Sequence, residues 1–515
     1  MPRAFPIRLA VPPACALLLA AAGPLAAQVP DAAPAAAQPA RAAAPQAGAP
    51  APLTLQEAIA LAQEHGHTAR AARAAHEAAR YRDHAFRDRL LPQLSLAGTV
   101  PSYNRSIVQV LQVDTATGNA VTLFQPQAQT TTSLSLQLSQ TLPLTGGSLF
   151  LSSSLTRLAL SGQGALQTWS STPVTVGLRQ DIFRPNVAGW DRREQNVEIE
   201  EQERSYRRAM EDVAVQTTGL FFAAYAARKN LDNALANVGV NDTLYRLNTG
   251  RFQVGRIGEN DLLQSQLALL RARTSLDAAR LEFERATAQL RLALGLPADR
   301  PLEVAVTPAV PELEPDTARA VAEALRNAVT VSDVALADVQ ARRRVTEAQL
   351  ADGVGATLQA SYGYNATAPS MHLAYQNLLE ARTFSLGVEL PLWQWGAHGA
   401  GVKAAEADRD RVADQSALAL EQLALDAKFA ALNLSQARRN VALLTVSDSV
   451  AGKRFEVAYN RYVIGKINIG DLYIAQQEKD AALVQFVGGL GDYWLAYYRL
   501  RQVTLFDFEA GRPLR

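Results

Sequence analysis

The sequence predicts a mainly α-helical chain with a membrane β part, built from two copies of one helix–strands–long helix–helix unit. A twelve-residue segment occurs twice, as RFQVGRIGENDL from Arg251 to Leu262 and as RYVIGKINIGDL from Arg461 to Leu472. Each copy interrupts long Ala- and Leu-rich helical stretches, and strand-like alternation precedes both stretches. A fixed long period in a sequence indicates repeated structural units.

The two segments align without a gap because Arg251 and Arg461 are 210 residues apart. Five aligned pairs are identical, and each segment separates two charge-striped helical stretches, so we expect each to be the turn of a helical hairpin. We call these turns the first tip and the second tip. The identical pairs are Arg251/Arg461, Gly255/Gly465, Ile257/Ile467, Asp261/Asp471 and Leu262/Leu472.

Composition excludes some classes of function. The chain has 515 residues and a formal net charge of +1, so no bulk attraction to nucleic acid or an anionic surface is expected. Beyond the N-terminal segment, no window of ~18 uninterrupted apolar residues indicates a transmembrane helix.

The N-terminus has the pattern of a secretory signal peptide over residues 1–27. Arg3 and Arg8 precede an apolar run, and Leu25-Ala26-Ala27 offers a cleavage site, although a leucine three residues before the cut is unusual and leaves its position open. Cys15, the sole cysteine, lies in the apolar run in a poor lipidation context. Residues 28–52 are almost entirely Ala, Pro, Gln and Gly, and we expect a disordered tether.

The first repeat is expected at residues 53–300. A helical pattern over 54–91, interrupted at Gly66, precedes strands between about 93 and 183. This strand region includes an additional pair, at about 131–142 and 148–160, that the second repeat lacks. A helix of ~60 residues then begins near Asp191, and its return partner ends at Leu294 before Gly295.

The second repeat follows an inter-repeat linker at 301–315 and covers 316–515. One helix is expected over 316–351, and strands over about 355–395. A second ~60-residue helix is expected from about 401 to 460, and a last helix from about 470 to 506.

These elements cannot bury their surfaces within one copy. Helices of this length bury an apolar stripe only by packing sideways on other helices. Alternating strands with Leu and Val on one face leave open edges, and an outer-membrane barrel closes such edges. About six strands are too few for a barrel, which needs at least about eight, so we expect several copies to share one. Taken singly, the strands also fit a soluble β-sandwich and the helices a structural coiled coil.

The chain resembles the TolC-like outer-membrane efflux channel family. The resemblance covers about Leu53 to the end and rests on LTLQEAIALA, RLLPQLSL, SLGVELPLW and the two tip segments. It implies a homotrimer whose β-barrel contacts outer-membrane lipid and whose helical barrel crosses the periplasm. The tips would dock on a periplasmic adaptor protein that connects to an inner-membrane pump. The channel would be the passive exit duct of a tripartite efflux or type I secretion system.

The chain departs from this family in its strands. The additional pair would give 6 × 3 = 18 strands in a trimer instead of the usual twelve, if all of them join the barrel. The poor lipidation context of Cys15 also differs from the acylated N-terminus of some members. The transported substrate, the pump and the adaptor remain open.

Gate residues are expected at the tips. Asp261 and Asp471 follow the turns, at the N-terminus of the returning helices. A carboxylate there is stabilised by about 0.3–1 kcal/mol, and this effect alone explains an aspartate at both positions. The resemblance implies further that Asp471 forms a ring at the pore constriction and that Asp261 bonds to Tyr462 in the closed state. A second acid of the family falls at Ile474 and a basic partner at Ile467, so the gate is only half matched, although Arg256 and Lys466 lie close by.

The same tips are candidate contacts for the adaptor. Gly255 and Gly465 would permit a tight reversal of the backbone. The candidates are charged and aliphatic residues beside these glycines, and ordinary packing of the hairpin explains them as well. They are Arg251, Val254 and Gly255 in the first tip and Arg461, Ile464 and Gly465 in the second.

No catalytic constellation is present, and neither an enzyme activity, a cofactor, a metal nor nucleic acid is indicated. The six histidines lack metal-ligand spacing and are expected to be solvated. Gly488-Gly489-Leu490-Gly491 more readily allows close helix packing than phosphate binding. Trp393 and Trp395 fit an aromatic girdle or a packing cluster. The rival interpretation is a coiled-coil scaffold at the cell surface or in the periplasm.

Overall fold

The computed structural model describes residues 52–113, 118–161, 166–307 and 310–514. The predicted signal peptide at 1–27 and, apart from its last residue, the predicted tether at 28–52 lie outside the described residues. The division into two repeats remains a prediction, which the order of elements described next favours.

The helices occur as pairs of equal length. The four lengths are 11, 23, 67 and 36 residues, and each appears once in each half of the chain. The first half holds α1 (Leu55–His65), α2 (His67–Arg89), α3 (Val187–Gln253) and α4 (Glu259–Leu294). The second half holds α5 (Thr317–Asn327), α6 (Val329–Ala351), α7 (Ala397–Val463) and α8 (Ile469–Thr504).

Most helix boundaries follow local signals in the sequence. Thr54 and Glu57 form a capping box at the start of α1, and Gly66 separates α1 from α2 as expected. Gly295 ends α4 in the left-handed conformation, with φ 68°. The expectation of one helix over 316–351 is wrong, because Ala328 takes an extended conformation between α5 and α6. Ala328 occupies the place of Gly66 in the first half, and no glycine or proline in the sequence marks this break.

Six strands form one antiparallel sheet in the order β1-β2-β3-β4-β5-β6. The additional strand pair of the first repeat joins this sheet as β2 and β3. The strands are β1 (Gln93–Val113), β2 (Ala120–Thr141), β3 (Ser148–Ser161), β4 (Leu166–Ile182), β5 (Gly355–Ala368) and β6 (Leu379–Glu389). A short pair, β7 (Phe506–Asp507) and β8 (Arg512–Pro513), follows α8 and was not expected.

The two faces of the sheet differ in chemistry, as the alternation predicts. One row across the strands joins Leu94, Leu138, Leu151, Val176 and Tyr362, each opposite the next. The neighbouring row on the other face is formed by small and polar residues. It consists of Ser95, Gln137, Ser152, Thr175 and Gly363.

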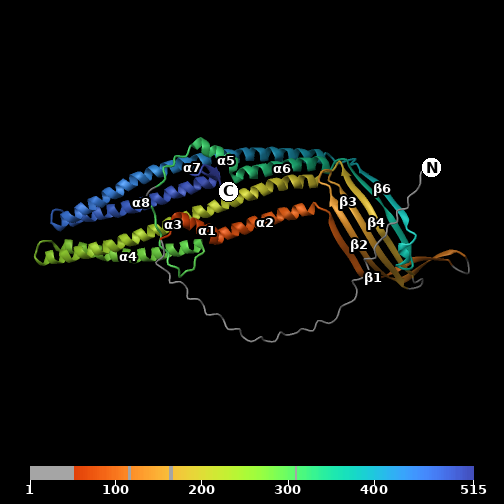
Figure 1. The fold of residues 1–515 in the computed structure, drawn as a ribbon, viewed down its shortest axis with the longest axis horizontal. Coiled ribbons are helices and arrows are strands. Elements are labelled where there is room, and N and C mark those ends of the chain that lie inside the picture. Colours follow the sequence, from red (N-terminus) through yellow and green to blue (C-terminus); the bar gives the residue numbers. More distant parts are fainter. Residues whose placement is uncertain (1–51, 114–117, 162–165, 308–309, 515) are drawn as a thin grey trace, which may run out of the picture. The chain divides into compact units, whose positions relative to one another are not determined.

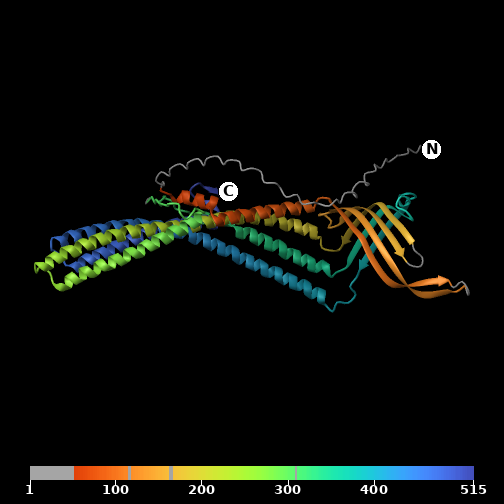
Figure 2. The same ribbon diagram turned by 90° about the horizontal axis from the view of Figure 1, so that it is seen from below.

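Prolines occur where the register shifts in β1 and in β4. Pro101 lies in the β1 bulge between Thr99 and Ser102, and Pro173 lies in the β4 bulge between Ser171 and Val174. Proline has no N–H to donate to the ladder, and bulges tolerate this loss. Beyond Ala128, where the pairing of β2 with β3 ends, β1 and β2 continue as a two-stranded ribbon that extends past the other strands (Figure 2).

The helices are ordered side by side like the strands. Next to the sheet, α2 packs on α3, α3 on α6 and α6 on α7; farther away, α4 packs on α3, α3 on α8 and α8 on α7. Figure 1 shows the strands at one end of these helices and both hairpin turns at the other. The row therefore has two borders, with β1, α2 and α4 at one and β6 and α7 at the other.

The main core lies midway along the long helices, where α1, α3, α4, α7 and α8 meet. Phe221, Leu290, Leu434 and Tyr493 are fully buried there. The predicted close packing at the glycine-rich stretch of α8 is confirmed, since a Cβ on Gly489 would lie 2.5 Å from the Leu444 side chain. Among the described residues, no helix combines the length and apolar character that crossing a membrane requires.

Candidate functional site: the two hairpin tips

Both tips reverse the chain in the same way. In the first, Gly255 donates to the carbonyl of Phe252 at 2.9 Å and Arg256 donates to that of Arg251 at 2.8 Å. The second tip repeats the two bonds at the same distances, from Gly465 to Tyr462 and from Lys466 to Arg461. This pattern is a Schellman motif, which places a left-handed residue just beyond the helix end.

The glycine conformation expected from the sequence is confirmed. Gly255 has φ +68° and Gly465 has φ +74°, in the region that side chains with a Cβ disfavour. Val254 and Ile464 precede these glycines and are 69% and 64% exposed, so each tip presents an aliphatic side chain to its surroundings.

Both aspartates lie in the first turn of the returning helix, as the sequence predicts. The Asn468 side chain accepts a hydrogen bond from the Asp471 backbone N–H at 2.8 Å and caps α8. Gly258 occupies the equivalent place before α4 and provides no side-chain cap.

Tyr462 does not form the hydrogen bond expected with Asp261. Its hydroxyl donates to Asn248 Oδ1 at 2.6 Å, and both side chains are buried. A phenol has a single proton to donate and an ionised carboxylate can only accept, so Asp261 cannot share this bond. Within one copy Tyr462 therefore bonds to Asn248, and its pairing with Asp261 in the closed state stays a prediction.

Arg251 joins the two tips. Its guanidinium donates to the backbone carbonyl of Val463 at 2.7 Å and of Tyr462 at 3.4 Å, and it lies 5.3 Å from the centre of the Tyr462 ring. These carbonyls belong to the last turn of α7, where the helix dipole favours a cation. Arg251 thus acts as a side-chain cap on the other hairpin of the same chain.

A small apolar cluster supports this junction. Leu244, Tyr462, Ile469 and Leu472 are buried together, and Val240, Leu247 and Tyr473 pack around them among other partly buried side chains. The cluster joins α3 to the second hairpin, so the second tip is anchored on α3.

Farther from the tips, the contact between α3 and α8 becomes polar. Asn233 and Asn237 on α3 each donate to Asp480 on α8 at 2.8 Å. A cavity of about 540 Å³ lies beside them, and seven of its sixteen lining residues are asparagines and glutamines of α3, α4 and α8. Sequence analysis did not single out these residues or Asn248, because they precede or follow the repeated segments.

Asp471 itself is exposed and lines a groove of about 290 Å³ between α7 and α8. Arg454 and Arg461 line the same groove, and Arg454 pairs with Glu478. Asp261 and Asp471 therefore differ in surroundings although they are equivalent in the repeat.

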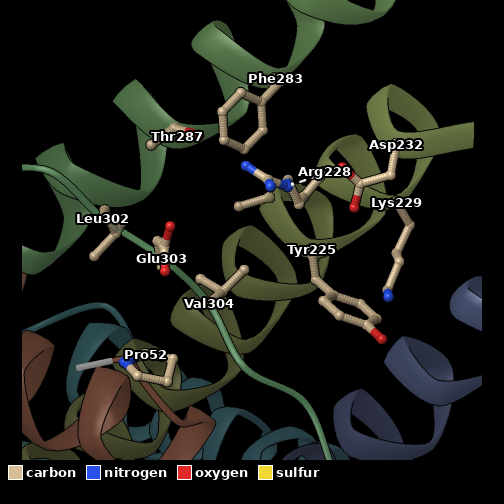
Figure 3. A pocket seen from close by; sticks show the side chains of 11 residues that line it. Pro52, Tyr225, Arg228, Lys229, Asp232, Phe283, Thr287, Leu302, Glu303 and Val304 are labelled. Atoms are coloured by element: carbon tan, nitrogen blue, oxygen red, sulfur yellow. Dashed lines mark ion pairs between the residues drawn. The ribbon is translucent and has the colours of Figure 1, made fainter. Parts of the chain in front are cut away.

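A separate cavity of about 220 Å³ lies where the 302–304 segment crosses α3 and α4 (Figure 3). Arg228 lies beside the Phe283 ring and pairs with Asp232 at 3.2 Å, while Lys229 and Glu303 add one charge of each sign. The opposite charges balance, so the cavity does not have a net-charged lining. Across the described ranges, no cluster of three or more His, Cys, Asp or Glu is arranged to hold a metal ion.

Residues 146–296 match the model of the family described as outer membrane efflux protein. No curated protein sequence matches the chain. Solved structures share the fold over most of the chain.

The CmeC outer membrane channel of Campylobacter jejuni has 16% identity, a TM-score of 0.64, and coverage of 89% of this chain and 86% of that one. VceC of Vibrio cholerae has 15% identity and a TM-score of 0.61, covering 90% and 97%. The open state of the MtrE channel of Neisseria gonorrhoeae has 14% identity and a TM-score of 0.58, covering 87% and 88%.

Fold and tips define an outer-membrane channel with a helical periplasmic part. The chain matches the outer membrane efflux protein family over residues 146–296, and over most of its length it has the fold of the TolC-like channels. It is an efflux duct, a passive channel and not an enzyme, and members of this family work with adaptor and pump partners. The rival interpretation as a coiled-coil scaffold is thereby set aside.

Proposed function

We propose that three copies of the chain close into one duct that is gated at the hairpin tips. The proposal rests on the two edges of a single copy, where the described strands and helices lack a neighbour on one side. Among the described residues, β1 and β6 each have a strand on one side only, and the six strands of this sheet are too few for a barrel.

Three copies would pair β6 of each with β1 of the next. The strands of the sheet alternate in direction and are even in number, so this pairing is also antiparallel. The barrel would contain 6 × 3 = 18 strands. Its apolar rows would face lipid, and its serine, threonine and glutamine rows would face the lumen.

The rim nearest the helices supports this orientation. Trp393 and Trp395 follow β6, are 73% and 90% exposed, and lie edge to face with ring centres 5.2 Å apart. Indole rings favour the membrane interface, where one end is apolar and the other is hydrated. We therefore assign the pair to the periplasmic rim of the barrel.

The gate is proposed at the second tip. Three copies would bring three Asp471 carboxylates to the constriction, where such a ring favours cations. Arg454 and Arg461 share the groove with Asp471 and reduce this field. Tyr462 and Asp261 remain proposed gate residues, with Tyr462 acting through Asn248, as its hydrogen bond indicates.

The adaptor contact is proposed at the same end. Val254 and Ile464 are exposed beside the two left-handed glycines, and Arg256 and Lys466 follow them. A periplasmic adaptor that connects to an inner-membrane pump would contact these aliphatic and basic side chains.

Reversal potentials of the purified protein in planar bilayers test the gate. In a potassium chloride gradient, Asp471→Asn should shift the reversal potential toward lower cation preference, because three negative charges leave the constriction. Asp261→Asn is the matched control at the equivalent position of the first tip and should shift it less. A reversal potential that Asp471→Asn leaves unchanged would count against the carboxylate ring.

A further inference from the structure

Two helices of the chain present uncovered apolar stripes. They are α4 and α7, which border the row of helices on opposite sides. The large apolar side chains on these stripes range from 43% to 70% exposed. They are Leu263, Leu267, Leu270, Leu281 and Leu292 on α4, and Leu418, Leu425, Phe429, Leu432, Leu443, Val446, Val450 and Val457 on α7.

The repeat explains what these stripes fit. α3 and α7 have equal length and are 210 residues apart, as are α4 and α8. Within one chain, α3 packs on α8. The equivalent pair is α7 and α4, which border the row on opposite sides and can meet only between copies.

The side chains that close the α3–α8 contact have equivalents on these stripes. Val240 and Leu247 of α3 correspond to Val450 and Val457 of α7, which are 59% and 57% exposed. Tyr473 of α8 corresponds to Leu263 of α4, which is 54% exposed. Part of the apolar cluster is thus present a second time with its two halves separated, whereas its buried members Leu244 and Ile469 correspond to the charged residues Arg454 and Glu259.

The polar pair of the α3–α8 contact has an apolar equivalent. Asn233 and Asp480, which are hydrogen-bonded, correspond to Leu443 and Leu270. These leucines are 70% and 52% exposed. Burial of apolar surface favours the association of two chains. A leucine pair is therefore better suited to a contact between copies than an amide–carboxylate pair.

The arginines complete the equivalence. Arg251 caps the end of α7 in its own chain, whereas its equivalent Arg461 is exposed and has no hydrogen-bond or ion-pair partner in the part of the chain that the structure describes. The residues that correspond to Tyr462 and Val463 are Phe252 and Gln253, at the end of α3. No side chain of the described residues donates to their carbonyls.

We propose that α7 of one copy packs on α4 of the next in the register of α3 on α8. Leu443 then contacts Leu270 of the neighbouring copy, and Arg461 caps the end of its α3 at the carbonyls of Phe252 and Gln253. Each first tip is therefore completed by an arginine of another copy. The inference rests on the trimer proposed above and assigns the residues of its helical seam.

The two seams then differ at the tip. Asn248 and Tyr462, which are hydrogen-bonded within the chain, correspond to Ala458 and Phe252, which cannot form this bond. Near the tip, the seam between copies therefore lacks this hydrogen bond and keeps the arginine cap.

Paired cysteines in the full-length protein in detergent test the register. Cys15, in the predicted signal segment, is the only cysteine of the chain. Oxidation of Leu270→Cys/Leu443→Cys should give covalent dimers and trimers on a denaturing gel without reductant. The matched control is Asn233→Cys/Asp480→Cys, which should consume its thiols and migrate as a monomer.

The mass of the native protein in detergent distinguishes a wrong register from a wrong oligomeric state. A trimeric native mass with only monomers after oxidation of the leucine-position pair would overturn the register. A monomeric native mass would overturn the trimer itself, and with it this inference.

The arginine cap is tested by trimer dissociation in urea. Arg461→Gln should lower the urea midpoint of dissociation, and Arg461→Lys should lower it less because the cation is retained. Arg256→Gln, an exposed arginine of the first tip, should leave the midpoint unchanged. An Arg461→Gln midpoint equal to that of Arg256→Gln would overturn the assignment of the cap.

Discussion

At the scale of single residues, one arginine has two different environments in the two repeats. Arg251 donates to the carbonyls of Tyr462 and Val463 at the end of α7, and the first of these also accepts from the Gly465 N–H. Arg461 occupies the same place in the repeat and is exposed in a single copy. The difference follows from the position of each hairpin, since only the first has the other hairpin of its own chain on that side.

Residue-level predictions from the sequence succeeded where the backbone decides the conformation. The positive φ of Gly255 and Gly465 follows from their place just beyond a helix. The bond from Tyr462 to Asn248 was not predicted, because it depends on a long-range contact with a residue outside the repeated segment. The difference between Asn248 and Ala458 in the aligned halves was the available signal.

Replacing Tyr462 by phenylalanine should weaken the junction of the tips. The Asn248 amide is fully buried, and losing its donor leaves that oxygen unsatisfied, at a cost of about 1–3 kcal/mol. Single-channel recording should show a larger open fraction for Tyr462→Phe. Tyr459→Phe is the control, since Tyr459 packs in the same cluster without a side-chain hydrogen bond there. Equal open fractions for the two variants would contradict a role of the Tyr462–Asn248 hydrogen bond in closing the channel.

Replacing either tip glycine by alanine should destabilise the protein. Left-handed backbone costs an L-residue about 1–2 kcal/mol, and both positions require it. Gly250→Ala is the control, because Gly250 lies inside α3 with open space around its Cα, and a helical alanine there stabilises by about 1 kcal/mol. Thermal unfolding should therefore shift in opposite directions. A shift of the same sign would argue against the turn geometry.

At the scale of elements, the strands were more predictable than the helix breaks. Alternation assigned the faces of β2 and β4 because the side-chain period of a strand is two residues. The break at Ala328 was missed because an alanine there has no local reason to leave a helix. α5 and α6 both pack on α7, but α5 also packs on α8 and α6 on α3, which no local pattern reveals.

The two faces of β2 predict opposite tolerance to charge. Leu136 lies on the apolar face, so Leu136→Arg should destabilise membrane insertion by about 2–4 kcal/mol. Ser135, on the opposite face, should accept Ser135→Arg with little effect on folding. Folding into lipid vesicles, followed by heat-modifiable gel mobility, measures both. Equal defects in the two variants would show that the faces are assigned wrongly.

At the scale of the whole molecule, the repeat allows one type of helix contact to be used twice in the proposed duct, once within a copy and once between copies. One copy contains one complete α3–α8 junction and the two halves of a second, on α7 and α4. The sequence predicted the need for several copies from the strand number. It could not predict which helices border the row, because this depends on the three-dimensional order α4, α3, α8, α7.

Block of the channel by cadmium tests the central claim, a duct whose constriction is at the second tip. In planar bilayers, cadmium should block Asp471→Cys channels, because three thiolates at the constriction bind a soft cation, and a chelator should restore the current. Channels with the native Asp471 and with Asp261→Cys should continue to conduct. Asp471→Cys channels that conduct fully in cadmium would contradict the account.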